Sequence, residues 1–298
     1  MKHAQMERTP FADLDSQPRE MTEMLLAALE AMGHHPEIRR VRRTAMDAFR
    51  PAPGAHLLDA GSGPGDVARS LAREVGATGD VIALDSSAAT VTAAVQRHDG
   101  SNVRYLTGDV SALVLEDDSV DGVWCERVLQ HVDDADVAIA ELIRVTRPGG
   151  RLCLIDTDWA SLAFDGVPAH LADRVVATMH GRLTPRQVDM GRTLRRRLVA
   201  AHLQDVTATP VTCLFGDPES AAVVLPMVNA GVPEEAWTTP PGVRDEWFAC
   251  VRAAGERGDS AVSRGVTSCR SGMAATGGGA AMCSSDQERA ASGTTDGW

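Results

Sequence analysis

The chain has 298 residues, of which 44% are hydrophobic and 23% charged, an ordinary composition for a globular protein. Its formal net charge of −12 argues against general nucleic-acid binding, which relies on basic surface to meet phosphates. No segment approaches the roughly 18 continuous apolar residues of a membrane helix, and the first 20 residues hold no apolar core of a secretory signal. We expect a cytoplasmic protein without a membrane partner. The six cysteines form no Cys-x-x-Cys pair, so no metal site is predicted.

The first predicted elements are two helices. Residues 17–33 carry apolar side chains at helical spacing, and residues 35–49 form a second helix before the breaker PAPG. The apolar face of the first helix is rich in methionine, at Met21, Met24 and Met32. Methionine adapts to irregular apolar ligands, so we expect residues 1–50 to form a lid. The alternative is that these methionines only pack in the hydrophobic core.

From residue 56 the pattern changes to alternating strands and helices. Strands are predicted at 56–60, 80–85, 102–109, 119–126 and 151–158. Helices are predicted between them at 66–75, 87–98 and 134–147, the last ending at Pro-Gly-Gly. This alternation predicts a mostly parallel sheet within a domain over residues 51–160. Ligands of such sheets bind beyond the carboxyl ends of the strands, where the strand order reverses.

The rest of the chain is less regular. Helices are predicted at 168–181, 187–202, 218–230 and 242–256, and a strand at 203–216. We assign residues 161–263 to the same domain, as helices and final strands on the acceptor side. Residues 264–298 are rich in Gly, Ala and Ser and have few large apolar side chains, so we expect a disordered tail.

The first predicted strand leads into a glycine-rich loop, HLLDAGSGPGD at 56–66. The dinucleotide fingerprint is Gly-x-Gly-x-x-Gly, whose glycines let the backbone approach a pyrophosphate. Here Gly61, Gly63 and Gly65 follow the spacing Gly-x-Gly-x-Gly, and Asp59 stands two residues before the first of them. A carboxylate so close to the loop suits a cationic ligand better than a phosphate.

Two more acidic residues end predicted strands. Asp85 closes the second strand 20 residues after Gly65, where a carboxylate can accept from both hydroxyls of a ribose. Asp109 closes the third strand, where it can accept from an exocyclic amine such as that of adenine. A cation, a ribose and an adenine without a phosphate describe S-adenosylmethionine.

Four segments then carry a family resemblance. In their order and spacing, these segments resemble the motifs of class I S-adenosylmethionine-dependent methyltransferases. They are HLLDAGSGPGD, ALDSS, TGDV and VWCERVLQHVDDADVAIAELIRVTRPGGRL. The resemblance covers residues 36–160 and is closest to the group of ubiquinone and menaquinone C-methyltransferases. It implies an α/β fold: a Rossmann-like, mostly parallel seven-stranded sheet with helices on both faces. The family ends in an antiparallel strand pair, but residues 260–272 are weakly apolar and broken by glycine, so we expect an impaired last strand.

The resemblance also implies roles for single residues. The expected cofactor contacts are Asp59, Gly61, Ser62, Gly63 and Gly65 for the methionine part, Asp85 and Ser86 for the ribose, Gly108, Asp109 and Val110 for the adenine, Glu126 and Arg127 beside the sulfonium, and Arg43 for the methionine carboxylate. His131 follows the fourth strand and is the candidate proton acceptor. Asp156, Asp158 and Trp159 are expected to face the acceptor. The structural alternatives are helix caps for the aspartates, a surface pair for Glu126 and Arg127, and a packing role for His131.

The expected function is methyl transfer from S-adenosylmethionine, with S-adenosylhomocysteine as product, to an oxygen, nitrogen or carbon of a small molecule of secondary metabolism. We expect a monomer or homodimer that does not bind nucleic acid. One alternative is a relative that catalyses a cyclisation or another non-methylating reaction. Another is a non-catalytic cofactor-binding scaffold. A nicotinamide oxidoreductase is disfavoured by the glycine spacing and by Asp59.

Overall fold

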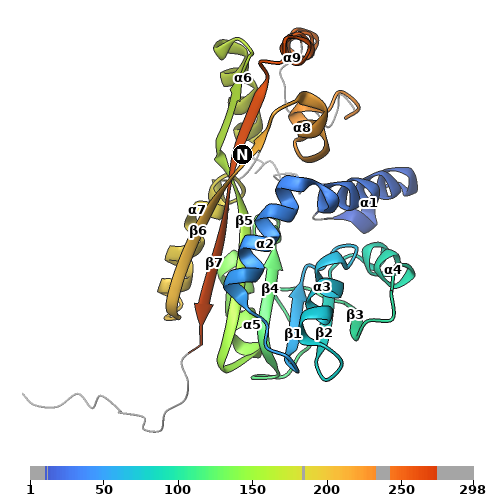
Figure 1. The fold of residues 1–298 in the computed structure, drawn as a ribbon, viewed down its shortest axis with the longest axis vertical. Helices are drawn as coiled ribbons and strands as arrows, with labels where there is room; N and C mark the ends of the chain where they lie inside the picture. The colour runs from blue at the N-terminus through green and yellow to red at the C-terminus, as the bar shows by residue number, and fades with distance from the viewer. Residues whose placement is uncertain (1–10, 12, 183–184, 233–241, 274–298) are drawn as a thin grey trace, which may run out of the picture.

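A single seven-stranded sheet organises the chain, in the order β3-β2-β1-β4-β5-β7-β6. The computed structural model describes residues 11, 13–182, 185–232 and 242–273 (Figure 1). The strands are β1 (His56–Ala60), β2 (Asp80–Asp85), β3 (Val103–Thr107), β4 (Val120–Glu126), β5 (Thr146–Asp165), β6 (Gln204–Phe215) and β7 (Ala261–Gly272). Strands β1 to β5 pair in parallel, and β7 runs antiparallel to both β5 and β6. The predicted Rossmann-like fold is confirmed.

Helices cover both faces of this sheet. They are α1 (Arg19–His34), α2 (Pro36–Phe49), α3 (Asp66–Val75), α4 (Ala88–Gln96), α5 (Ala135–Val145), α6 (Ala169–Arg182), α7 (Pro185–Ala200), α8 (Pro218–Val224) and α9 (Arg244–Arg257), with short 3-10 turns η1 (Leu14–Ser16) and η2 (Pro226–Val228). Leu57 of β1 packs in one core with Leu71 of α3. Its neighbour Leu58 packs in a second core with Leu142 of α5 and Leu194 of α7. The alternation of strand side chains therefore produces three layers.

Local sequence explains where several helices begin. Asp134 caps α5, since its carboxylate accepts from the N–H groups of Asp136 and Val137. Ser87 caps α4 by accepting from the N–H of Thr90. The helix α5 ends at Val145, and β5 already begins at Thr146, so Pro-Gly-Gly lies within the strand and not at the end of the helix.

The last strand differs from the expectation. Strand β7 is complete and lies between β5 and β6, bonded to both, so the prediction of an impaired strand and the start of a tail at residue 264 are wrong. Backbone pairing on two sides compensates for the modest apolar content, and Val262, Val266 and Cys269 are buried. Gly265 is required here: a Cβ would lie 2.7 Å from the Ser161 hydroxyl. Residues 274–298 lie outside the described part of the chain.

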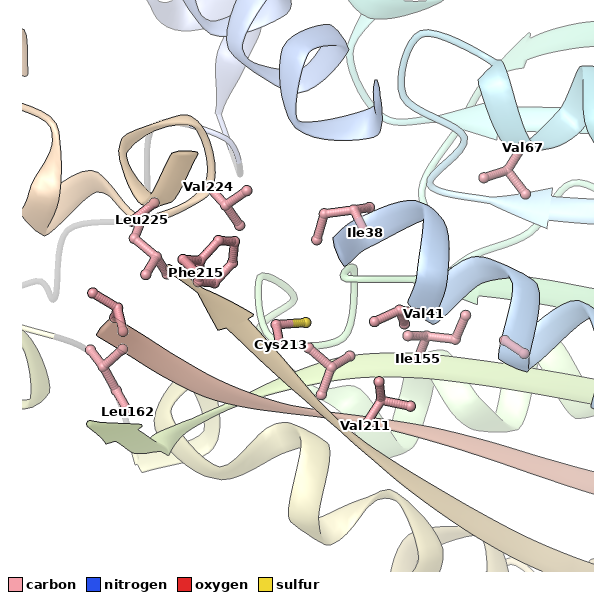
Figure 2. Close-up of a cluster of buried hydrophobic side chains, with 14 of the residues drawn as sticks. Ile38, Val41, Val67, Ile155, Leu162, Val211, Cys213, Phe215, Val224 and Leu225 are labelled. Carbon is pink, nitrogen blue, oxygen red and sulfur yellow. The ribbon is translucent and has the colours of Figure 1, made fainter. Parts of the chain in front are cut away.

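The long strands carry the second half of the core. Figure 1 shows β5, β6 and β7 extending beyond the parallel strands toward α6, α8 and α9. Figure 2 shows alternate side chains of β6, including Cys213 and Phe215, turned toward the helices with Ile38 and Val41 of α2 nearby. Phe215 also lies beside the His35 ring, with 5.2 Å between ring centroids. This packing joins α2 and α8 to the antiparallel end of the sheet.

Replacing Phe215 by alanine tests this packing. Phe215 is 1% exposed, so Phe215→Ala should lower the free energy of unfolding by about 3–5 kcal/mol through lost burial and the cavity left behind. Leu214 is the matched control, because it precedes Phe215 on β6 and is 59% exposed; Leu214→Ala should change stability by less than about 0.5 kcal/mol. Urea denaturation measures both. Equal losses would contradict the assigned packing.

Candidate active site

The functional cavity opens at the carboxyl ends of β1, β2 and β4 and has a volume of about 1040 Å³. One wall is the apolar face of α1, which contributes Met21, Met24, Leu25, Ala28, Leu29 and Met32. Residues of α8 and η2 also line the cavity. The predicted methionine face therefore lines the cavity. The described residues contain no helix long and apolar enough to cross a membrane, and no cluster of metal-ligating side chains.

The glycine loop is fixed against its neighbours and forms the floor of the cavity. The N–H groups of Gly61 and Ser62 both donate to the carbonyl of Leu84, at 2.7 and 2.9 Å. Gly61 has φ +73, and a Cβ there would lie 2.1 Å from a methyl carbon of Val128. Gly63 has open space where its Cβ would be, so the backbone is exposed to a ligand.

Gly65 has a different place from the one predicted. It caps α3 with φ +81 and does not line the cavity. A Cβ on Gly65 would lie 3.0 Å from Arg69 Nη1 and from Tyr105 Cε1. Its role is to turn the chain tightly into α3.

Two carboxylates line the floor: Asp59, which is buried, and Asp85, which is half-buried. The Asp59 Oδ2 atom has no hydrogen-bond partner among the described residues. Burial, and then the negative charge of Glu126, raise the Asp59 pKa to about 8, against the opposing pull of Arg42. Asp85 accepts from the N–H groups of Gly63 and Ser87, at 2.9 and 3.0 Å, while burial raises its pKa.

The expected adenine side lies at the carboxyl end of β3. Asp109 is exposed and lines the cavity, and its Oδ1 accepts from the N–H of Ser111 at 2.8 Å. Ser86, Gly108 and Val110 line the same region. These residues meet at one edge, as their positions after neighbouring strands predict.

An ion pair links α2 to the sheet above this floor. Arg42 Nε lies 2.9 Å from Glu126 Oε2, and Arg127 Nε lies 3.5 Å from Glu126 Oε1. Burial works to raise the Glu126 pKa, but the two arginines prevail and hold it below its ordinary value. Arg42, not the predicted Arg43, lines the cavity, and Arg43 is exposed. One residue turns a helix by about 100°, which moves Arg43 away from the sheet.

The residues expected on the acceptor side divide into two groups. His131 and Trp159 line the cavity, whereas Asp156 and Asp158 do not. Asp156 is fully buried and accepts from the N–H groups of Gln130 and Thr157, and burial raises its pKa to about 7. Asp158 pairs with Arg192 at 2.9 Å. Burial, and then the charge of Arg127, lower the His131 pKa to about 4.

Sequence patterns gave no sign of two further residues. Asp15, in η1, accepts from the Ser87 hydroxyl at 2.6 Å and from the N–H groups of Ala88 and Ala89 at 2.7 and 3.1 Å. This contact ties the N-terminal segment to the start of α4, beside Asp85. Arg264 of β7 lines the cavity from within the stretch that resembled a tail. Asp15 contacts Ser87, and Arg264 contacts Trp159, so each of them meets a residue far away in the chain.

Comparisons with known proteins agree with this geometry. A family described as methyltransferase domain matches residues 58–154. The chain is 34% identical over 120 residues to a demethylmenaquinone methyltransferase of Renibacterium salmoninarum, over 40% of this chain and 48% of the relative. It is 37% identical over 196 residues to an uncharacterised 37.1 kDa protein in transposon Tn4556 of Streptomyces fradiae, over 63% of this chain and 54% of the relative. Residues 58–154 therefore belong to a methyltransferase domain family, and the chain is similar to S-adenosylmethionine-dependent methyltransferases.

Solved methyltransferases share the fold. Phosphoethanolamine N-methyltransferase 2 of Haemonchus contortus, in complex with S-adenosyl-L-methionine, gives a TM-score of 0.56 at 18% identity over 89% of this chain and 60% of that one. A putative methyltransferase of Bacillus halodurans gives 0.54 at 17% identity, over 78% and 98%. The chain spans about half the length of the curated relatives that it matches.

The floor of this methyltransferase cavity fits S-adenosylmethionine. An unpaired carboxylate oxygen on Asp59 suits the ammonium of the methionine part. The open backbone at Gly63 admits a bulky group, and Asp85 stands at the end of β2 with both oxygens already oriented by backbone N–H groups. The cofactor predicted from the sequence therefore agrees with the family and with the chemistry of these residues.

The raised pKa of Asp59 gives a pH prediction. A bound ammonium favours the carboxylate form, so binding below pH 8 should release a proton, and affinity for S-adenosylhomocysteine should rise by up to about tenfold per pH unit between pH 6 and 8. Calorimetry in buffers of different ionisation enthalpy measures the released proton. Asp59→Asn should bind more weakly and with a flatter pH profile. An unchanged slope in that variant would show that another group titrates.

Proposed function

We propose that the protein transfers the methyl group of S-adenosylmethionine to an oxygen, nitrogen or carbon atom of a small molecule. The observation that supports this most directly is one continuous cavity with two chemically different halves. Carboxylates at the ends of β1 and β2 line one half, Trp159 and Arg264 of β5 and β7 line the other, and the methionine face of α1 also lines the cavity. Such a cavity seats a polar donor beside a largely apolar acceptor. The family membership supports methyl transfer in general.

The donor half follows from the positions of three carboxylates. Asp59 would pair with the ammonium of the methionine part, and Asp85 would accept from the ribose hydroxyls. Asp109 would accept from the adenine amine. When bound, the cofactor supplies a methyl group activated by a positively charged sulfur. These three aspartates would fix its orientation, so that the methyl group points toward the acceptor half.

The acceptor half has to align the nucleophile and exclude water. An in-line displacement gains most from correct positioning, and an apolar wall keeps water from competing with the acceptor. The α1 face would serve as this lid, held near the donor end by Asp15. His131 would accept a proton where the acceptor must lose one. Its lowered pKa leaves the imidazole neutral and able to accept a hydrogen bond at neutral pH.

A binding experiment with Asp85 tests the donor assignment. Asp85→Ala should weaken binding of S-adenosylhomocysteine by about 10-fold to 100-fold, because charge-assisted hydrogen bonds are worth about 1.5–3 kcal/mol each. Asp80→Ala is the matched control, since Asp80 begins the same strand and lies outside this cavity. Calorimetry with S-adenosylmethionine, S-adenosylhomocysteine and NAD gives the readout. Binding of NAD with neither sulfur nucleoside bound would overturn the proposed function.

A kinetic experiment tests His131. His131→Gln should lower the rate of label transfer from methyl-tritiated S-adenosylmethionine to an acceptor found by screening, while affinity for S-adenosylhomocysteine stays within about twofold. Since the His131 pKa is about 4, the wild-type rate at saturating S-adenosylmethionine should show no histidine step near 6.5 and should fall through His131 only as the pH approaches 4. Unchanged turnover in the variant would exclude His131 as the proton acceptor.

A further inference from the structure

Arg264 is a buried cation in the wall of the cavity. It lies on β7, is only 2% exposed, and is among the cavity-lining residues. Within the described ranges of the chain, its Nε and Nη2 atoms have no hydrogen-bond partner. Among the residues that the structure describes, no carboxylate forms an ion pair with it. A guanidinium taken out of water without a counter-charge costs several kcal/mol.

The neighbours of Arg264 hold it without neutralising it. Its guanidinium carbon lies 4.8 Å from the centre of the Trp159 ring, a cation–π contact. The Trp159 ring is fixed in turn, because Nε1 donates to Gln130 Oε1 at 2.9 Å. Cys213 is the other contact, and burial raises the pKa of its thiol, so it carries no negative charge. Stacking and a thiol contact leave the head group able to turn toward a ligand.

A second arginine adds to the positive charge. Arg127 also lines the cavity, and its Nε has no hydrogen-bond partner. Its nearest carboxylate, Glu126 at 3.5 Å, is already engaged by Arg42 at 2.9 Å. Burial, and then the charge of Arg127, lower the pKa of Arg264 to about 10, so each of these cations disfavours the other.

The negative charge of Asp156 acts to raise the pKa of both Arg127 and Arg264, but it balances these two cations only in part. Its two oxygens accept from the backbone N–H groups of Thr157 and Gln130, and the residue is outside the cavity lining. Burial raises the Asp156 pKa to about 7, which further reduces its negative charge at neutral pH. The half of the cavity next to β7 is therefore short of an anion.

The position of Arg264 separates it from the donor. In the sheet order, β7 lies three strands from β1 and four from β2. At roughly 4.8 Å per strand, this places the backbone of β7 on the order of 14 Å from that of β1, where Asp59 stands. The carboxylate of a methionine group sits on the same carbon as its ammonium. Arg42, beside Asp59 and Glu126, is far better placed for that carboxylate.

We propose that the methyl acceptor is an organic acid whose carboxylate binds Arg264, with Arg127 as a second cation. This inference rests on the proposed function, because it concerns the acceptor half of the same cavity. The Nε and Nη2 atoms form one edge of the guanidinium, and this edge accommodates the two oxygens of a carboxylate. The methionine side chains and Trp159 receive the apolar body of the acid. A carboxylate in this place supplies the counter-charge that the protein lacks.

The test compares acids with their neutral esters. The probes are benzoate, 4-hydroxybenzoate and 1-hydroxy-2-naphthoate, each beside its methyl ester, titrated by calorimetry into protein saturated with S-adenosylhomocysteine. At least one acid should bind about 10-fold to 100-fold more tightly than its ester. Arg264→Gln should abolish the difference. Arg270→Gln, on the same strand but outside the cavity lining, should retain it.

Two control measurements separate recognition from folding. S-adenosylhomocysteine should bind Arg264→Gln within about twofold of wild type, and the melting temperature without acceptor should stay level or rise by roughly 2–4 °C, because an unpaired buried charge is removed. A lower melting temperature, or a loss of S-adenosylhomocysteine binding in this variant alone, would overturn the proposal. So would a panel in which no acid exceeds its ester. Failure of the wild type to bind S-adenosylhomocysteine would instead contradict the proposed function.

Discussion

The arrangement of the site depends on the buried ion pair between Arg42 of α2 and Glu126 of β4. This pair bridges a helix that comes before the sheet in the chain and a strand at its centre. Removing Glu126 would take from Arg42 and Arg127 the carboxylate that they share, at a cost of about 3–5 kcal/mol. The pair therefore positions the N-terminal helices over the sheet. It also sets the charge around Asp59, whose pKa responds to both of its members.

The charges in the cavity are unevenly distributed. Asp59, Asp85 and Asp109 line the half next to β1, β2 and β3, Arg264 lines the half next to β5 and β7, and Arg127 follows β4 between them. In the function proposed above, a cationic donor would face the acidic half and an anionic acceptor the basic half. Transfer of a methyl cation from sulfur to an anion reduces the charge on both reactants. Where the accepting atom is that anion, exclusion of water favours the step, because water stabilises the separated charges.

The sequence was sufficient to predict the parallel half of the fold and the gathering of three aspartates at one edge of the sheet. Asp59, Asp85 and Asp109 each end a strand whose apolar run is local and easily recognised, and parallel strands bring their ends to one edge. Arg43 was predicted to reach the cofactor, whereas its neighbour Arg42 lines the cavity. The sequence pattern does not show which of two adjacent arginines faces the sheet. Asp15 and Arg264 were beyond prediction for a different reason. Their contacts are with residues more than 50 positions away, and no local pattern records them.

Strand β7 is complete although its weak apolar content predicted an impaired strand. Its small residues permit a close approach rather than break the strand. The pairing of β5 with β7 shifts register between Asp158 and Ala163, and Ser161 holds this bulge by accepting from the Gly265 N–H at 2.8 Å and donating to the Asp158 carbonyl at 2.6 Å. A bulge turns side chains away from regular alternation and is common beside active sites.

Trp159 lies at the start of this bulge and faces Arg264 on the neighbouring strand. A larger residue at position 265 would displace Ser161, since a Cβ there already falls 2.7 Å from its hydroxyl. The bulge, and with it the ring on which the guanidinium stacks, would then shift. The glycine that made the strand look impaired is thus a condition for placing Trp159 and Arg264 together in the cavity wall.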